Sequence, residues 1–258
     1  MEEININTNT KFKRANGQEK IRSKEMKEIA NNVFHIPLMP RSSINAYLIE
    51  GVLVDSGIRS SYSILRKAIQ AIPAHAHVLT HAHADNQGCT HRICSTFNLP
   101  LMCHISEVWR TETGLVTKDY PEASGMIAKF QQKYWAGGGA PVDSLLKEGD
   151  WLGNFRVIET PGHSSGHLSF FREKDGVLIA GDVAANMNHL TTVSGLHLPP
   201  KIFTTDMDEN RHSLTKLAGL NPEIICFGHG PVLYNKKKQF EKFVNKNQIY
   251  EMVSNRLF

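Results

Sequence analysis

The sequence predicts an α+β fold, in which short β-strands and amphipathic helices share one compact chain. Three observations support this class. The chain has 258 residues and is 41% hydrophobic, enough for one large core or two small ones. Short apolar runs bounded by turn residues recur along it, as at 33–36, 46–49 and 52–55. Segments with helical apolar spacing, such as 60–72, lie between these runs.

The first half of the chain predicts strands followed by helices. Glu50 and Gly51 form a turn between the strands at 46–49 and 52–55. A helix at 60–72 ends at Pro73, because proline disfavours helical backbone in the residue before it. The remaining predicted elements of this half are a buried strand at 76–79, a helix at 88–97 and a strand at 101–103.

A helical insertion is predicted at 104–139, closed by three consecutive glycines. Its aromatic residues either cover a site as a lid or make ordinary core contacts, and the sequence favours neither. The elements predicted after it are a strand at 155–158, a hairpin of 168–171 with 177–180, a helix at 206–220, a strand at 223–227 and a helix from about 235 to the end.

Composition excludes several classes of function. The net charge of +4 is too small and too scattered to indicate a nucleic-acid partner. No apolar run approaches the ~20 residues that cross a bilayer, and the N-terminus lacks the apolar segment of a signal peptide. The four cysteines form no CxxC pair. We therefore expect a cytoplasmic protein without membrane contact, with a flexible tail at 1–25 and one domain at 26–258; its oligomeric state is not determined.

Two histidines and an acid follow the predicted strand at 76–79. His81, His83 and Asp85 occupy alternate positions, and alternate side chains of an extended segment point the same way. Two imidazoles and a carboxylate that converge beyond a strand are ligands for a divalent cation such as zinc. The alternative is that these are ordinary polar loop residues.

The same arrangement recurs further along the chain. His163, Asp182 and His229 each follow a short apolar strand and lie beside a glycine or another turn residue, and Asp55 is a weaker case. Small neighbours let the backbone approach a metal closely. Repetition of these residue types in this setting strengthens the prediction of a metal site.

These motifs together resemble the metallo-β-lactamase-fold hydrolase superfamily over about residues 33–233. The motifs are Thr80-His81-Ala82-His83-Ala84-Asp85, Thr160-Pro161-Gly162-His163, Gly181-Asp182 and Gly228-His229-Gly230. The resemblance implies a four-layer αββα sandwich with a metal site at one edge of its sheets. It also implies that His81, His83 and His163 bind a first metal, that Asp85 and His229 bind a second, and that Asp182 bridges the two.

One position departs from the family. The first motif usually ends in Asp-His, but this chain has Asn86 where the family supplies another imidazole. An amide oxygen is a much poorer zinc ligand than imidazole. We therefore expect one tightly bound zinc and a second metal that is weak or absent. A histidine from elsewhere, such as His189 or His212, is an alternative source of the missing imidazole.

The predicted function is hydrolysis of a small-molecule ester, lactone, thioester or similar carbonyl substrate by a metal-bound hydroxide. Asp85 is the candidate catalytic residue, because without a second metal it is free to orient the water or accept its proton. Two alternatives remain: a mononuclear non-haem iron sulfur dioxygenase, and a degenerate member that only binds a ligand. Electron transfer through a di-iron site is disfavoured, because that branch places Glu where this chain has His83.

Overall fold

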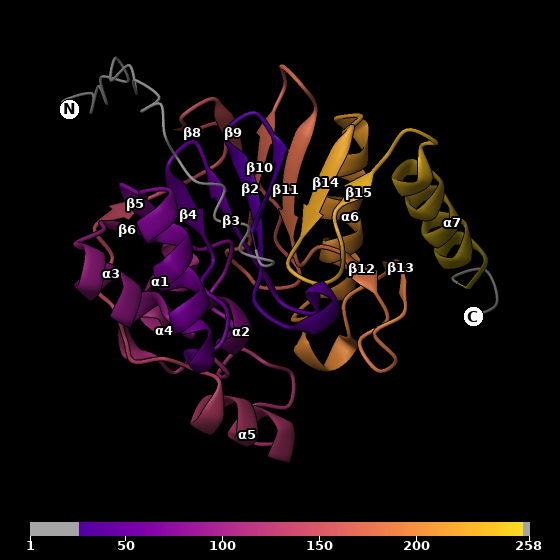
Figure 1. The fold of residues 1–258 in the computed structure, drawn as a ribbon. Coiled ribbons are helices and arrows are strands. Elements are labelled where there is room, and N and C mark those ends of the chain that lie inside the picture. Colours follow the sequence, from indigo (N-terminus) through magenta and orange to yellow (C-terminus); the bar gives the residue numbers. More distant parts are fainter. Residues whose placement is uncertain (1–25, 255–258) are drawn as a thin grey trace.

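Two β-sheets pack face to face in this protein, with helices on both outer sides (Figure 1). The computed structural model describes residues 26–254, so the predicted flexible tail at 1–25 lies outside the described residues. The four layers run helix, sheet, sheet, helix, and they confirm the predicted αββα sandwich.

The first sheet is antiparallel at its N-terminal end and parallel from β4 onward. Its strands within the described residues are, in spatial order, β1 (Lys27–Ala30), β2 (Val33–Pro37), β3 (Asn45–Ile49), β4 (Val52–Val54), β5 (Ala76–Val78), β6 (Leu101–Cys103) and β7 (Ser144–Leu145). Glu50 and Gly51 form the predicted turn between β3 and β4, with φ values of 50° and 86°.

The second sheet is antiparallel except where β11 pairs with β14. Its strands are, in spatial order, β15 (Leu233–Tyr234), β14 (Ile224–Phe227), β11 (Val177–Gly181), β10 (Leu168–Arg172), β9 (Phe155–Glu159) and β8 (Trp151–Leu152). The predicted hairpin of β10 and β11 is confirmed. A separate hairpin joins β12 (Ala185–Met187) to β13 (Ser194–His197).

Helices connect and cover the strands. The α-helices are α1 (Tyr62–Ala71), α2 (Ala84–Gln87), α3 (Thr90–Phe97), α4 (Val108–Thr113), α5 (Met126–Tyr134), α6 (Met207–Gly219) and α7 (Gln239–Ser254). Short 3-10 helices are η1 (Pro40–Ser42), η2 (Arg59–Ser61), η3 (Ile105–Glu107) and η4 (Lys201–Phe203). Asp206 caps α6, because its side chain accepts hydrogen bonds from the backbone of Asp208 and Glu209.

The strands are continuously apolar because both of their faces are buried. Val52 and Val54 face the second sheet, whereas Leu53 faces the layer of α1 and α3. In β10, Phe170 faces the first sheet and Phe171 faces the layer of α6 and α7. Each such side chain contributes roughly 1.5–3 kcal/mol on burial, so three apolar layers fix the sandwich.

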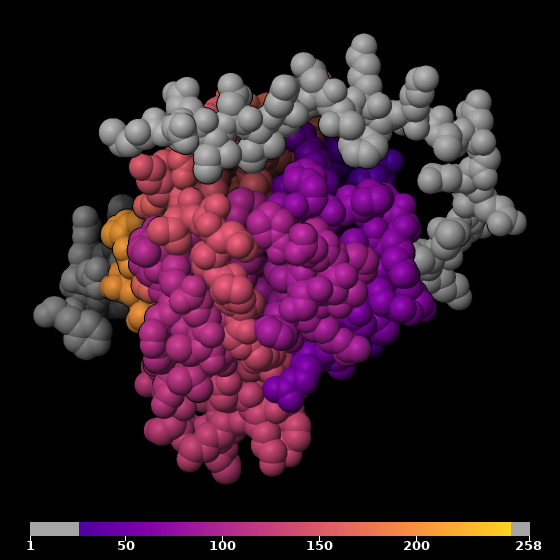
Figure 2. Space-filling model, turned by 90° about the vertical axis from the view of Figure 1, so that its left-hand side faces the viewer, coloured from indigo at the N-terminus to yellow at the C-terminus, as the bar shows by residue number. Residues whose placement is uncertain are grey.

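The predicted helical insertion projects from one end of the sandwich through α5 (Figures 1 and 2). Its aromatic residues divide between the two predicted roles. Phe130 and Tyr134 of α5 are 51% and 55% exposed, so they are not core contacts. Tyr120 is buried, and its ring lies 4.8 Å from that of His83. The insertion therefore contributes one wall beside the predicted site and one exposed aromatic helix.

None of the helices within residues 26–254 is long and apolar enough to cross a membrane. The four cysteines are free thiols, and Cys89, Cys103 and Cys226 are buried. Cys89 packs behind the first motif, where its thiol donates a hydrogen bond to the carbonyl of Ile58. These thiols are therefore small core residues.

Candidate metal centre

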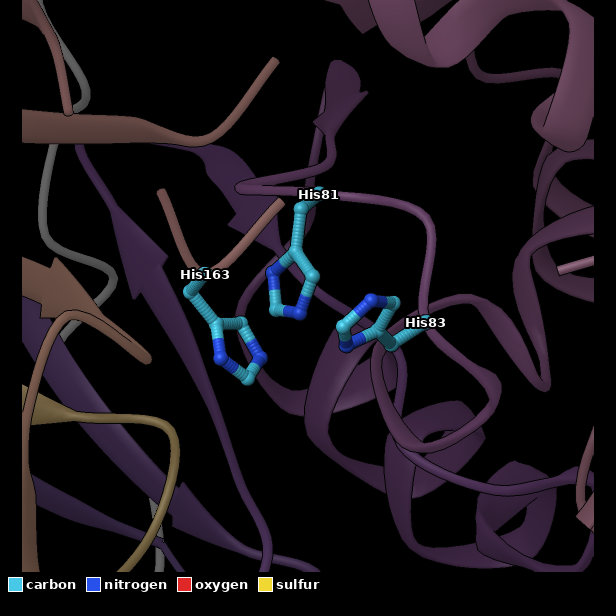
Figure 3. Close-up of side chains that lie close together, drawn as sticks. All are labelled: His81, His83 and His163. Atoms are coloured by element: carbon cyan, nitrogen blue, oxygen red, sulfur yellow. The ribbon is translucent and has the colours of Figure 1, made fainter. Parts of the chain in front are cut away.

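Three histidines from two loops converge at one edge of the sheets (Figure 3). His81 and His83 lie between the end of β5 and the start of α2, and His163 follows β9. One ring nitrogen from each lies within 4.8 Å of the others, and all three side chains are buried. This is the one such cluster of metal-ligand atoms within the described part of the chain. The three residues that the resemblance assigns to a first metal therefore lie together.

Hydrogen bonds behind the histidines select which nitrogen faces the cluster. The Thr80 hydroxyl donates to Asp55 Oδ2 at 2.8 Å, and it therefore accepts from His81 Nδ1 at 3.0 Å. His163 Nδ1 lies 3.2 Å from Thr204 Oγ1, whose proton goes to a backbone carbonyl. Both rings consequently carry their proton on Nδ1 and present an unprotonated Nε2.

His83 is oriented by a carboxylate that sequence reasoning missed. Its Nε2 lies 3.6 Å from Asp119 Oδ1. Nδ1 is therefore the ring nitrogen of His83 that remains for the cluster. Asp119 is held by Arg110 at 3.0 Å, and Arg110 pairs with the buried Glu107 at 2.6 Å. No motif surrounds Asp119 in the helical insertion, so only the fold brings it to the site.

The electrostatic setting differs among the three histidines. Burial lowers the pKa of His83, but the Asp119 carboxylate outweighs burial and raises it above its usual value, whereas His81 and His163 are kept neutral. Burial lowers the pKa of His81 well below its usual value, and the nearby His83 and His163 imidazoles lower it further. Burial and His83 likewise lower the pKa of His163. The buried Nε2 of His81 has no hydrogen-bond partner within the described residues. A neutral, unpaired imidazole nitrogen is what a zinc ion binds, so the residues fit this metal.

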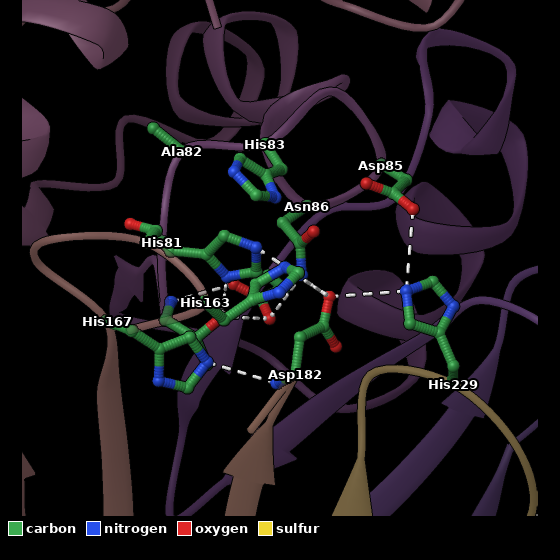
Figure 4. A network of polar contacts seen from close by, with 12 residues as sticks. His81, Ala82, His83, Asp85, Asn86, His163, His167, Asp182 and His229 are labelled. Carbon is green, nitrogen blue, oxygen red and sulfur yellow. Dashed lines mark hydrogen bonds and ion pairs between the residues drawn. The ribbon is translucent and has the colours of Figure 1, made fainter. Parts of the chain in front are cut away.

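Asp182 lies between the three histidines and His229 (Figure 4). Its Oδ2 is 3.7 Å from His81 Nε2, 3.8 Å from His163 Nε2 and 3.2 Å from His229 Nε2. Asp85 Oδ2 lies 3.5 Å from His229 Nε2. One carboxylate oxygen therefore lies close to both groups of predicted ligands.

Asp85 reaches this position by a different route from the predicted one. The chain leaves the strand at Val78, and Asp85 lies in the first turn of α2 rather than on an extended segment. Its carboxylate therefore faces His229 and not the cluster of three histidines. The alternate spacing predicted the direction of His81 and His83, but the helix start decided that of Asp85.

Opposite charges set the protonation of the second group. Burial lowers the pKa of His229, but the Asp182 and Asp85 carboxylates outweigh burial and raise it to about 10. Burial raises the pKa of Asp182, yet attraction to His229 dominates and holds it below its usual range. Burial raises the pKa of Asp85 despite its contact with His229. Two carboxylates thus face one imidazole, and this arrangement attracts positive charge.

The loop that carries His229 is fixed by the first sheet. His229 Nδ1 donates to the carbonyl of Ser43 at 2.7 Å, so its Nε2 faces Asp182. The Asn45 amide donates to the carbonyls of Phe227 and Gly230 at 3.0 and 2.7 Å. These hydrogen bonds hold the loop of His229, which follows a strand of the second sheet, against the first sheet.

Asn86 is held by a hydrogen bond through its amide nitrogen. The side chain is buried, and its Nδ2 donates to Asp55 Oδ2 at 3.1 Å. The remaining Oδ1 has no partner within the described residues. His167 has a structural role, because its Nε2 accepts from the backbone N–H of Asp182 at 3.0 Å.

The family model of the metallo-beta-lactamase superfamily matches residues 39–229. The chain belongs to this superfamily. It is 32% identical over 225 residues to Probable metallo-hydrolase YflN of Bacillus subtilis (strain 168), a match that covers 79% of this chain and 81% of that protein. The predicted class, a metal-dependent hydrolase of this superfamily, is confirmed.

Two further similarities concern substrate and metal. Hydroxyacylglutathione hydrolase of Rhodopseudomonas palustris (strain BisB5) is 30% identical over 114 residues, which cover 39% of this chain and 45% of that protein. The solved structure of TTHA1623 in a di-iron-bound form has a TM-score of 0.57 and 26% identity, covering 78% of this chain and 94% of that one.

Proposed function

We propose that this protein is a zinc-dependent hydrolase of a small ester, lactone or thioester, with its tightly bound metal held by His81, His83 and His163. The observation that carries the proposal is the cluster of three buried imidazoles whose ligand atoms lie within 4.8 Å of one another. Three imidazoles leave a tetrahedral metal with a position for water, which is the pattern of catalytic rather than structural zinc sites.

A divalent metal bound there supplies hydroxide at neutral pH and polarises a substrate carbonyl. The chain supplies the remaining functions. Asp182 Oδ2 lies close to both His81 and His163 and neutralises part of the charge of the centre. Asp85 Oδ2 lies 3.5 Å from His229 Nε2, and when only the first metal is bound this carboxylate is not needed as a ligand and is our candidate to orient a water molecule or to accept its proton.

Thioesters are the first substrates to test. The similarity to hydroxyacylglutathione hydrolase supports this choice, although it covers only part of either chain. Next to the metal cluster, Tyr120 stacks edge-on against His83 and Phe203 at 4.8 and 5.3 Å between ring centroids. These rings form an apolar wall that suits the acyl part of such a substrate.

The test combines metal content with a substrate panel. We expect purified chain to retain one zinc through dialysis and to hydrolyse at least one member of a set of esters, lactones and thioesters. His163→Ala should lose that zinc and lower kcat/KM by at least a hundredfold, because only two imidazoles would remain to hold the metal. His212→Ala is the control, since His212 is exposed on α6. Retention of zinc by His163→Ala would contradict the proposal.

An iron enzyme is the second candidate, supported by the di-iron form of TTHA1623 in the same fold. Imidazole and carboxylate ligands also suit non-haem Fe(II). Metal analysis of protein purified without oxygen separates the two functions. Iron together with oxygen uptake on addition of a persulfide would favour a sulfur dioxygenase, whereas zinc with ester or thioester hydrolysis favours the hydrolase.

A further inference from the structure

A histidine without an assigned role lies beside the second group of candidate ligands. His189 follows β12, in the turn of the β12–β13 hairpin. Its ring centroid is 4.8 Å from that of His229, and the two planes meet at 65°. His229 Nε2 in turn lies 3.2 Å from Asp182 Oδ2 and 3.5 Å from Asp85 Oδ2. His189 is therefore next to the imidazole that both carboxylates face.

The side chain of His189 is also chemically available. Its Nε2 is buried and has no hydrogen-bond partner within residues 26–254. Buried polar atoms normally have partners, so the unpaired Nε2 of His189, on a ring packed against that of His229, is free to bind a ligand. By contrast, His212 is exposed on α6 and is not a candidate for this position.

The backbone holds His189 and His229 to each other. The N–H of Asn186, in β12, donates to the carbonyl of His229 at 2.9 Å, and the Asn186 amide donates to the carbonyl of Pro231 at 2.8 Å. Beyond β12, Asn188 Oδ1 accepts from the N–H groups of two following residues at 3.0 Å each and so shapes the turn. The backbone segments that carry the two imidazoles are thus joined by hydrogen bonds.

The second group has one imidazole, that of His229, because this chain has Asn86 where the family motif has another histidine. The amide nitrogen of Asn86 already donates a hydrogen bond to Asp55. We propose that His189 takes its place and completes a second metal site with His229, Asp182 and Asp85. Two imidazoles and two carboxylates suit a divalent cation such as zinc. The inference rests on the proposed function, because Asp182 serves both sites. Within the described residues only the three histidines form a compact cluster of ligand atoms, so we expect weaker binding at the second site.

Zinc-buffered dialysis tests the second site directly. Wild-type chain, His189→Ala and the control His212→Ala are equilibrated at a series of free-zinc concentrations, and zinc per chain is measured by mass spectrometry. We expect the wild type and the control to reach two zinc ions, the second at free zinc at least tenfold above the first. His189→Ala should require at least tenfold more free zinc for its second ion.

The first ion reports whether each variant is folded, because none of the residues proposed to hold it is replaced. An unchanged second affinity in His189→Ala would overturn the inference. A wild-type chain that stays at one ion at saturating zinc would overturn it too, and both results leave the proposed function standing. A wild-type chain that binds no zinc would overturn the proposed function together with the second site.

Discussion

At the scale of single residues, the site depends on side chains that contact the predicted metal ligands from behind. Each imidazole of the three-histidine cluster has a polar partner beside its other ring nitrogen: Thr80, Asp119 or Thr204. Such partners fix the ring orientation and the position of the proton. Asp119 is the one charged partner among them, so it is expected to raise the basicity of His83 most.

Replacing Asp119 tests this role. Asp119→Ala removes the carboxylate 3.6 Å from His83 Nε2, and we expect the first zinc to bind about 10–100-fold more weakly. Asp119→Asn keeps an acceptor without the charge and should fall between that variant and the wild type. Asp208→Asn is the control, because that side chain is 72% exposed on α6. Competition with a chelating dye measures the affinity, and equal affinity in all four proteins would refute the role.

Asn86 allows a second test at this scale. Asn86→His introduces the imidazole that the family motif usually supplies, so we expect the second zinc to bind at least tenfold more tightly. It should also make that ion insensitive to His189→Ala. Asn86→Gln is the control, because it keeps a neutral amide in a buried position. A second affinity that is equal in the histidine and glutamine variants would show that position 86 lies outside the ligand set.

At the scale of elements, loops at the ends of strands carry the predicted ligands. The loop after β14 must approach Asp182 closely, and Gly228 makes this possible. A Cβ atom at Gly228 would overlap the Asp182 carboxylate, while the Gly228 N–H donates to the carbonyl of Gly181 at 3.0 Å. The small residue is therefore required by the approach of two strands rather than by a turn.

Gly228→Ala should therefore destabilise the protein by about 1–3 kcal/mol, because the added methyl group forces apart two packed loops. Gly219→Ala is the matched control. It lies at the end of α6, where an added Cβ meets nothing within 4 Å. Chemical denaturation of both variants measures the difference, and equal free energies of unfolding would show that the β14 loop yields without strain.

At the scale of the whole molecule, stability and function are built from the same layers. Ligands come from both sheets, so the metal centre forms only when the sandwich closes. His77 in β5 illustrates how a polar side chain is accommodated in the core near the site. Its Nδ1 donates to the carbonyl of Leu53 at 2.9 Å, and its Nε2 lies 3.0 Å from Thr90 Oγ1. The buried ring is thus satisfied in its neutral form.

Acid should weaken the fold through His77. Burial lowers its pKa from 6.5 to about 4. Between these values the unfolded chain binds more protons than the folded chain, so stability is full above pH 6.5 and falls as the pH drops toward 4. The contribution is roughly 3 kcal/mol over this range. His77→Gln cannot titrate, and urea unfolding at pH 7 and pH 5 should show a smaller acid loss than in the wild type. Identical losses would contradict the prediction.

Much of the fold was predictable from local patterns. Runs such as 52–54 and 177–180 are apolar on both faces, and this property depends only on which residues are adjacent in the chain. Boundaries were less accurate where caps decide them, as at α7, which begins at Gln239 rather than near 235. The single domain at 26–258, the cytoplasmic location and the number of metals remain predictions.

The sequence by itself determined the residue types of the centre and their place at strand ends, because His81, His83, His163, Asp182 and His229 each stand in a short motif. Only the tertiary structure decided that Asp119 orients His83 and that His189 lies against His229. Neither residue is adjacent in sequence to the ligand it contacts. Spacing along the chain carries no information on such contacts, since the packing of the insertion and of the β12–β13 hairpin creates them.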